Sequence, residues 1–315
     1  MKLPLYICGL IIALFHISCN DGNSVIYTDT TTSGTIKISV DETFAQIIDG
    51  ELDTFHALYK HANVVPRYTN ETNVFQDLLN DSARIIVATR MLTAEEKTVF
   101  EGRKITPRIT VIAKDAIAFI THHTNQDSIL TMQHVYDILS GKIKKWDEIN
   151  TQNKSGNIQI IFDHKNSSTA RYVKDSILKG STFAENVFAV DSNVAVINYV
   201  STHPNAIGVL GVSWISDGDD PTTLGFLKMV RTLAIVAPDS TAGAGKSYQP
   251  YQAFIATNYY PYTRAVYIIS REARSGLGTG FAAFVAGDKG QRIILKSGIM
   301  PATQPVRIVG FRNNN

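Results

Sequence analysis

Apolar and polar residues alternate along most of the chain, and the period of the alternation switches between two values. Residues 35–40 alternate one by one, which is typical of a strand. Residues 44–59 carry apolar side chains at the spacing of a helix face. By the same criteria, further strands are predicted at 63–68, 85–88, 105–113, 116–121, 158–162 and 206–211, and further helices at 72–79, from Thr93 onward, at 130–139, 168–178 and 194–202.

Strands and helices that follow one another in turn indicate an α/β fold with largely parallel sheets. The alternation starts again after residue 125, so the pattern predicts two α/β units with a cleft between them. In such sheets, ligands bind at the carboxyl ends of the strands, beside the starts of helices.

The first residues have the pattern of an export signal. Lys2 is followed by an apolar run, residues 3–17, which is shorter than the roughly 20 residues of a membrane span. The run ends at Ser18, and a polar stretch follows. A charged start, an apolar middle and a small residue before the cut are typical of a secretory leader, which we expect to span residues 1–18.

Cysteine content adds a lipid anchor to this prediction. The chain has two cysteines, and Cys8 lies inside the leader. Cys19 follows a small residue, which resembles the lipobox of bacterial lipoproteins, although His16 stands where leucine is usual. The resemblance implies a lipid on Cys19 and a polar tether over residues 19–34. A plain cleavable signal with an incidental Cys19 is the alternative.

Composition excludes several classes of function. Hydrophobic residues make up 44% of the chain, which is normal for a globular core. The formal net charge of +2 gives no basic face for nucleic acid, so no nucleic-acid partner is expected. No HExxH spacing occurs and no further cysteine supports a metal, so we expect no metal and no cofactor. No nucleophile and base stand together, so an enzyme is not expected.

Hydroxyl-bearing residues stand at three predicted strand-to-helix turns. They are residues 41–44, residues 88–90, and residues 166–169 before the helix that carries Arg171. The start of a helix presents unpaired N–H groups that attract anions, and arginine adds charge-assisted hydrogen bonds. Plain helix capping explains any one turn equally well. Together, the three turns favour an anion site.

Four segments resemble the phosphate ABC-transporter substrate-binding protein family. They are residues 137–149, which contain Trp146, and residues 206–211, 259–264 and 281–291. The resemblance covers almost all of residues 35–305. It implies a two-lobed periplasmic-binding-protein-like fold, with a mostly parallel sheet and flanking helices in each lobe and hinge strands between the lobes. It also implies lobe boundaries, with lobe 1 at 35–117 and 234–315 and lobe 2 at 118–233.

The resemblance also implies a set of anion-binding residues. These fall in the turn after the first strand, near residue 70, in the turn after the third strand, and in the turn that matches the Ser-Gly-Thr of the family: Thr43, Phe44, Asn70, Thr89, Ser167, Ser168 and Thr169.

The chain departs from the family pattern at the charged positions. Asp163 stands where the family usually has arginine, and Ser168 replaces its glycine. We therefore expect Arg90 or Arg171 to neutralise the anion. Asp163 or Glu71 would accept the proton of phosphate, which sulfate lacks. The alternatives are that Asp163 points to solvent and Arg90 forms a local ion pair.

These observations predict a monomeric, lipid-anchored protein of the bacterial cell envelope. It would capture a small oxyanion, with inorganic phosphate as the expected ligand, and deliver it to an ABC permease. A surface or sensor lipoprotein with the same fold is an alternative that the sequence does not separate. A phosphate-ester hydrolase is a further alternative.

Overall fold

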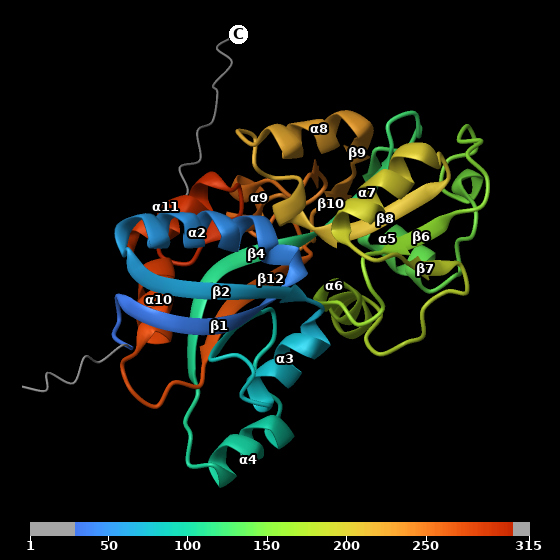
Figure 1. Cartoon of the computed structure of the whole chain (residues 1–315). Coiled ribbons are helices and arrows are strands. Elements are labelled where there is room, and N and C mark those ends of the chain that lie inside the picture. The colour runs from blue at the N-terminus through green and yellow to red at the C-terminus, as the bar shows by residue number, and fades with distance from the viewer. Residues whose placement is uncertain (1–28, 305–315) are drawn as a thin grey trace, which may run out of the picture.

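The computed structural model describes residues 29–304 as two α/β lobes placed side by side (Figure 1). The main sheet runs through both lobes in the order β2-β1-β3-β12-β4-β8-β6-β7. The predicted two-lobed α/β fold is therefore confirmed. The predicted leader and Cys19 lie outside the described residues. No helix in the described part of the chain is long and apolar enough to cross a membrane.

Lobe 1 contains the strands β2, β1, β3 and β12, which come before β4 in this order. β1 pairs in parallel with β2 and β3, and β12 pairs antiparallel with β3 and β4. These strands alternate or run apolar as the sequence predicts, because their buried sides face helices on both faces of the sheet. The strand bounds are β1 (Ser33–Asp41), β2 (His61–Thr69), β3 (Ile85–Ala88), β12 (Thr263–Ser270) and the short β13 (Met300–Pro301), which pairs with β4.

Helices cover both faces of the lobe 1 sheet. One layer packs α2 against α10 and α11, and α3 packs on β1 and β3 from the other side, with α4 beyond it (Figure 1). The predicted helix from Thr93 onward is α4, which Thr93 caps in a capping box with Glu96. The bounds are η2 (Glu42–Phe44), α2 (Ala45–Leu58), α3 (Glu71–Leu79), α4 (Ala94–Gly102), α9 (Gln252–Ala256), α10 (Leu277–Ala286) and α11 (Asp288–Lys296).

Lobe 2 is built on the parallel strands β7, β6 and β8, with α7 packed on β8 and β6. The predicted helix at 168–178 is α6 (Ser168–Tyr172) continued by a π-helical turn, η4 (Val173–Ile177). The other bounds are β5 (Ile129–Leu130), α5 (Met132–Leu139), η3 (Trp146–Glu148), β6 (Gln159–Phe162), β7 (Val187–Ala189), α7 (Asn193–Thr202), β8 (Ala206–Gly211), η5 (Val212–Trp214), α8 (Pro221–Met229) and β9 (Val230–Thr232). β10 (Ala234–Val236) and β11 (Ser247–Tyr248) come later in the chain and form a separate three-stranded sheet with β5.

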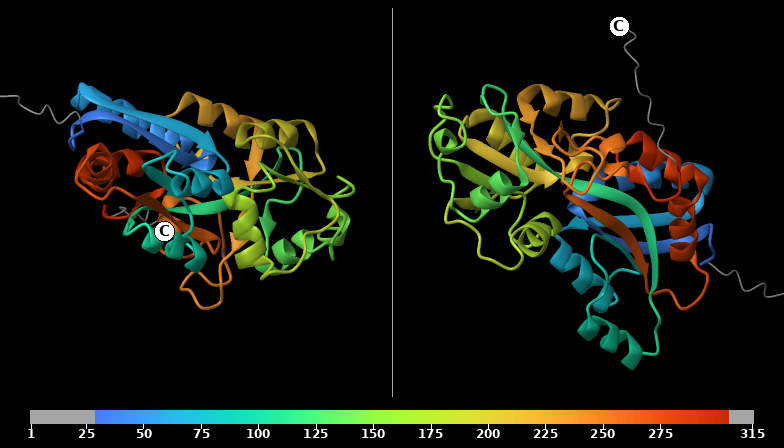
Figure 2. Two further views of the ribbon diagram at one scale, coloured as in Figure 1. Left: turned by 60° about the horizontal axis from the view of Figure 1, so that its bottom comes forward. Right: turned by 180° about the vertical axis from the view of Figure 1, so that it is seen from behind.

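One long strand, β4 (Arg108–His122), runs from lobe 1 into lobe 2 (Figure 2). Its first part pairs with β12 up to Ala116, and its second part pairs with β8 from Ile117. The sequence predicts two strands separated at Lys114–Asp115, and this prediction is wrong. Asp115 is fully buried in an ion pair with Arg264, so the charge does not end the strand. We propose that the lobes divide at this change of partner and again near residues 233–234.

The end of the predicted tether packs onto the fold. β1 begins at Ser33, and Asp29 accepts a hydrogen bond from the backbone N–H of Leu277 at 2.9 Å. The carbonyl of Thr31 lies against Gly280, where a Cβ atom would approach it to 1.8 Å. The tether therefore does not extend to residue 34, because residues 29–34 are fixed to lobe 1.

Candidate functional site

The loops singled out in the sequence meet where the two lobes touch. Arg171 of α6 bonds to Glu71 and Thr89 of lobe 1. The Ser213 hydroxyl, on η5, donates to the carbonyl oxygen of Thr43 at 2.8 Å. Because these contacts join residues far apart in sequence, they define an interlobe region around the turns after β1, β3 and β6.

Two threonine hydroxyls in this region are buried and have no hydrogen-bond partner among the described residues. They are Oγ1 of Thr43, in the turn after β1, and Oγ1 of Thr169, at the start of α6. Both side chains were predicted as anion ligands. An unsatisfied buried hydroxyl costs about 1–3 kcal/mol, so such atoms are uncommon unless a ligand completes them.

A buried guanidinium that the sequence did not assign lies beside them. Arg264, at the start of β12, is 5% exposed, and its Nε donates to Asp115 Oδ2 at 2.9 Å. Its Nη1 donates to the hydroxyl of Ser168 at 3.0 Å. Its Nη2 has no partner among residues 29–304. Burial alone would lower the pKa of Arg264, but the facing carboxylates of Asp115 and Asp41 raise it, so the side chain is charged.

Gly211, the last residue of β8, shows how closely these groups approach one another. A Cβ atom there would lie 2.2 Å from Thr43 Cγ2, 3.1 Å from Arg264 Nη2 and 3.4 Å from Asp115 Oδ2. Thr43 and the free nitrogen of Arg264 therefore flank a single point at the edge of lobe 2. A larger residue at position 211 would push them apart.

Acidic side chains surround the same region. Asp163, at the end of β6, is 3% exposed rather than directed to solvent, and its Oδ1 lacks a partner in the described part of the chain. Burial raises the pKa of Asp163. Burial also raises the pKa of Asp41 to about 6, with the charge of Glu71 adding to the effect.

Glu42 is the acid that links the two lobes here. Its carboxylate accepts a hydrogen bond from the side-chain amide of Asn193, at the start of α7. Burial raises the pKa of Glu42 to about 7 against the effect of that hydrogen bond. The site therefore combines one buried cation with two carboxyl groups, those of Asp41 and Glu42, whose pKa lies close to neutral pH.

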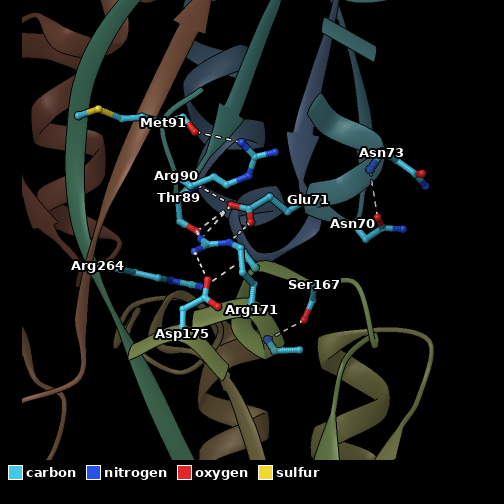
Figure 3. A network of polar contacts seen from close by, with 12 residues as sticks. Asn70, Glu71, Asn73, Thr89, Arg90, Met91, Ser167, Arg171, Asp175 and Arg264 are labelled. Carbon is cyan, nitrogen blue, oxygen red and sulfur yellow. Dashed lines mark hydrogen bonds and ion pairs between the residues drawn. The ribbon is translucent and has the colours of Figure 1, made fainter. Parts of the chain in front are cut away.

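Glu71 is engaged by protein groups (Figure 3). It accepts from Arg171 and from both the backbone N–H and the hydroxyl of Thr89, at 3.0 and 2.9 Å. Burial favours the neutral acid, but the hydrogen bond and charge of Arg171 outweigh it and lower the pKa of Glu71. In this structure, Glu71 and Arg171 neutralise each other across the lobe interface.

Several predicted ligands have local partners. Arg90 forms a two-pronged ion pair with Glu96, at 2.8 Å for each nitrogen, and its guanidinium carbon lies 3.3 Å from the centre of the Phe75 ring. This is the local ion pair that the sequence offered as the alternative. Asn70 caps α3 through its side chain.

Ser167 caps α6 in the same way. Phe44 is buried, and its ring centre lies 5.6 Å from the Arg264 guanidinium carbon.

A pocket of about 470 Å³ lies outside this buried cluster, at the mouth between the lobes. Glu71, Arg90 and Arg171 line it together with Lys165 and Lys174. The region that the structure describes contains no cluster of three or more His, Cys, Asp or Glu side chains placed to hold a metal.

The sequence pattern around Arg264 indicates a buried ion pair. β12 is an apolar, buried strand with one charge at its start, and β4 is an apolar strand interrupted by Asp115. Two opposite charges in two apolar strands predict a buried ion pair if those strands are neighbours. Only the fold shows that they are, because 149 residues separate the partners.

Comparisons with known proteins agree with this architecture. A family model described as a PBP superfamily domain matches residues 26–289. Phosphate-binding protein PstS of Borreliella burgdorferi is 24% identical over 275 residues, covering 84% of this chain and 89% of the relative. PstS of Staphylococcus saprophyticus is 26% identical over 264 residues, covering 82% of this chain and 77% of the relative.

Solved structures show the same fold. A candidate phosphate ABC transporter substrate-binding protein of Clostridium perfringens, solved with bound phosphate, has a TM-score of 0.71 at 19% identity, over 86% of this chain and 100% of that one. An ABC-type phosphate transport receptor of Vibrio cholerae has a TM-score of 0.62 at 20% identity, over 85% and 100% of the two chains.

Proposed function

The chain belongs to the PBP superfamily, and from this premise we propose that it is a solute-binding protein that encloses inorganic phosphate between its lobes for ABC-type import. The ligand is suggested by the curated relatives, which are named phosphate-binding proteins. One of the structures with the same fold holds phosphate.

One observation in this chain carries the proposal. Three buried polar atoms that lack partners among the described residues come from both lobes: Thr43 Oγ1 and Arg264 Nη2 from lobe 1, and Thr169 Oγ1 from lobe 2. Two hydroxyls and a charged donor are the groups that an oxyanion requires. Because the donors come from both lobes, the ligand would hold the lobes closed.

Asp163 supports phosphate over sulfate. Its Oδ1 is buried and without a partner in the described structure, so it can accept a proton from a ligand. Phosphate at neutral pH carries a proton, whereas sulfate would place an unpaired oxygen against this carboxylate. Glu71 was the other predicted acceptor, and its oxygens already accept from Arg171 and Thr89.

Transport and anchoring complete the proposal. Residues 1–18 would direct export, and a lipid on Cys19 would hold the monomeric protein at the bacterial cell envelope, where an ABC permease could receive the anion. The nine residues between Cys19 and Asp29, where the described fold begins, would serve as the tether. We expect the chain to bind its ligand without chemical change, because the curated relatives are named as binding proteins.

Calorimetry tests the proposed ligand. The protein is residues 20–315, which lacks Cys19 and keeps the whole described fold. Phosphate should bind one to one with a Kd of micromolar or lower, and sulfate at millimolar concentration should give no heat. Equal binding of both anions would contradict the role of Asp163, and no response to phosphate would contradict the proposed ligand.

A further inference from the structure

We propose that Arg264 is the cation that binds the oxyanion, a role for which the sequence suggested Arg90 or Arg171. The inference rests on the proposed function, because it names the charged group of the same site. It also adds a residue of the hinge strands to ligands that otherwise come from helix and strand ends of the two lobes.

The geometry of the guanidinium leaves one nitrogen for a ligand. Nε is held by Asp115 at 2.9 Å and Nη1 by Ser168 at 3.0 Å, so two contacts fix the plane of the group. Nη2 is buried and has no partner in the described part of the chain. A buried, charged N–H group is costly to leave without an acceptor, so a bound anion oxygen is the partner that this nitrogen requires.

The free nitrogen lies beside a predicted ligand. The point 3.1 Å from Arg264 Nη2, where a Cβ atom of Gly211 would stand, is also close to the Thr43 side chain. Ser168 connects the same guanidinium to Thr169, the next residue in α6. Arg264 therefore lies close to Thr43 and is bonded to the residue that precedes Thr169.

The other two arginines are occupied. Arg171 bonds to Glu71, and Arg90 bonds to Glu96 with both terminal nitrogens. Each of these pairs is close to electrically neutral and lines the outer pocket. Recruiting either arginine for an anion would leave a carboxylate without its partner, whereas Arg264 can bind an anion and keep Asp115.

The same assignment accounts for a departure from the family pattern. The family has glycine where this chain has Ser168, and a glycine could not hold Arg264 from lobe 2. The hydroxyl of Ser168 accepts from Nη1, so this substitution supplies a contact that the guanidinium uses. Asp163, in turn, leaves lobe 2 without the usual arginine. Arg264, which lies in the family-like segment 259–264, remains as a buried cation.

The position of Arg264 also fixes the charge at the base of the cleft. Arg264 and Asp115 are partners in the register of β12 and β4, one residue before β4 changes from its lobe 1 partner to its lobe 2 partner. At this point β4 is paired with β12 of lobe 1, and a few residues later it is paired with β8 of lobe 2. The cation therefore stays with the lobe 1 sheet when the lobes open, while Thr169 of lobe 2 moves toward it on closure.

The test measures phosphate affinity by calorimetry and melting temperature on residues 20–315. The main variant is Arg264→Met combined with Asp115→Leu, because replacing both members of a buried ion pair by apolar residues often preserves stability. The matched control is Arg90→Gln, which removes an arginine from the outer pocket. We expect the double variant to melt close to the wild type and to bind phosphate at least 100-fold more weakly, and the control to stay within threefold.

The outcomes distinguish the assignment of Arg264 from the proposed binding of phosphate. Wild-type affinity in a folded double variant would overturn the assignment of Arg264, and a large loss in Arg90→Gln alone would move the cation to Arg90. If the double variant does not fold, Arg264→Lys decides: a loss of tenfold or more at an unchanged melting temperature supports the assignment, and unchanged affinity overturns it. A wild type that binds no phosphate would overturn the proposed function and, with it, this assignment.

Discussion

At the scale of single residues, two buried hydroxyls in the interlobe region support the proposed site. Thr43 and Thr169 are almost completely buried, and their hydroxyls are nevertheless unpaired among the described residues. Elsewhere in the interlobe region, hydroxyls such as those of Ser213 and Thr89 are bonded to protein groups. This contrast within the interlobe region supports the proposal that the two hydroxyls bind the ligand.

Asp163 should determine which anion is accepted. We expect Asp163→Asn to weaken phosphate binding by about 1–3 kcal/mol at pH 7.5, because the amide that replaces the carboxylate is a weaker acceptor of the ligand's proton. Binding of sulfate should gain or stay unchanged. Calorimetry with both anions measures the ratio of affinities.

The control for this variant is Asp175→Asn, which removes an exposed carboxylate that lies 3.7 Å from Arg171 in the outer pocket. It should leave the ratio of affinities unchanged. If Asp163→Asn also leaves the ratio unchanged, Asp163 does not accept the proton of phosphate.

Glu51 is a second buried acid, and it lies away from the site. It is fully buried in α2, neither carboxylate oxygen has a partner in the described chain, and burial raises its pKa to about 8. The folded protein therefore keeps the proton at a pH where the unfolded chain has released it. This difference makes the free energy of unfolding fall as the pH rises from about 4.5 to about 8.

Glu51→Gln should remove this dependence on pH. Relative to the wild type, the variant should gain about 2–4 kcal/mol in the free energy of unfolding between pH 5 and pH 8. Urea unfolding at both pH values measures the gain, and Glu101→Gln, an exposed position on α4, is the control. An equal difference at both pH values would show that Glu51 does not titrate in the folded state.

Sequence reasoning found part of the residue-scale picture. Thr43 and Thr169 were identified because they follow strands in a family-like motif. Arg264 was missed because its meaning depends on Asp115, which is distant in sequence and adjacent only through the pairing of β12 with β4. The partners of Arg90 and Arg171 depend in the same way on how the loops pack.

At the scale of elements, local pattern predicted most helices and strands. The pattern of apolar residues identified β1, α2 and β3 because the buried side chains of each element are mostly apolar. The pattern failed at β4, because the polar residues Lys114–Asp115 predict the end of a strand. The strand instead continues through them, since Asp115 is buried in an ion pair. A charge inside a strand looks like a break unless its partner is known.

The contact between α3 and α6 should act as a latch between the lobes. Arg171 donates to Glu71 and to Thr89, so three hydrogen bonds cross the interface. Arg171→Gln should favour the open form and weaken phosphate binding about tenfold, which is about 1.4 kcal/mol. Calorimetry measures the affinity, and small-angle scattering of the unliganded variant should show a larger radius of gyration.

Arg90→Gln is the matched control, because the Arg90–Glu96 pair lies within lobe 1. It removes the same charge from the outer pocket without touching a bond between the lobes. A loss of affinity as large as that of Arg171→Gln would indicate that charge at the pocket, and not the latch, sets the affinity.

At the scale of the whole molecule, the structure places the charge of Arg264 at the junction of two lobes that each carry a candidate hydroxyl donor. β4 and β12 run side by side at the junction of the lobes (Figure 2). They hold Asp115 and Arg264 there, and each lobe contributes to the site one hydroxyl that has no partner among the described residues. The two-lobed shape could be predicted from the restart of the strand and helix alternation. The contacts between the lobes could not be predicted, because they join residues such as Glu42 and Asn193 that lie 151 positions apart.

The most direct measurement of this account is a crystal structure of residues 20–315 with arsenate, which has the shape and protonation of phosphate and can be located by its anomalous scattering. We predict one strong peak between the lobes, within hydrogen-bonding distance of Thr43 Oγ1, Thr169 Oγ1 and Arg264 Nη2. A peak in the outer pocket at Arg90 or Arg171, or no peak between the lobes, would contradict the account.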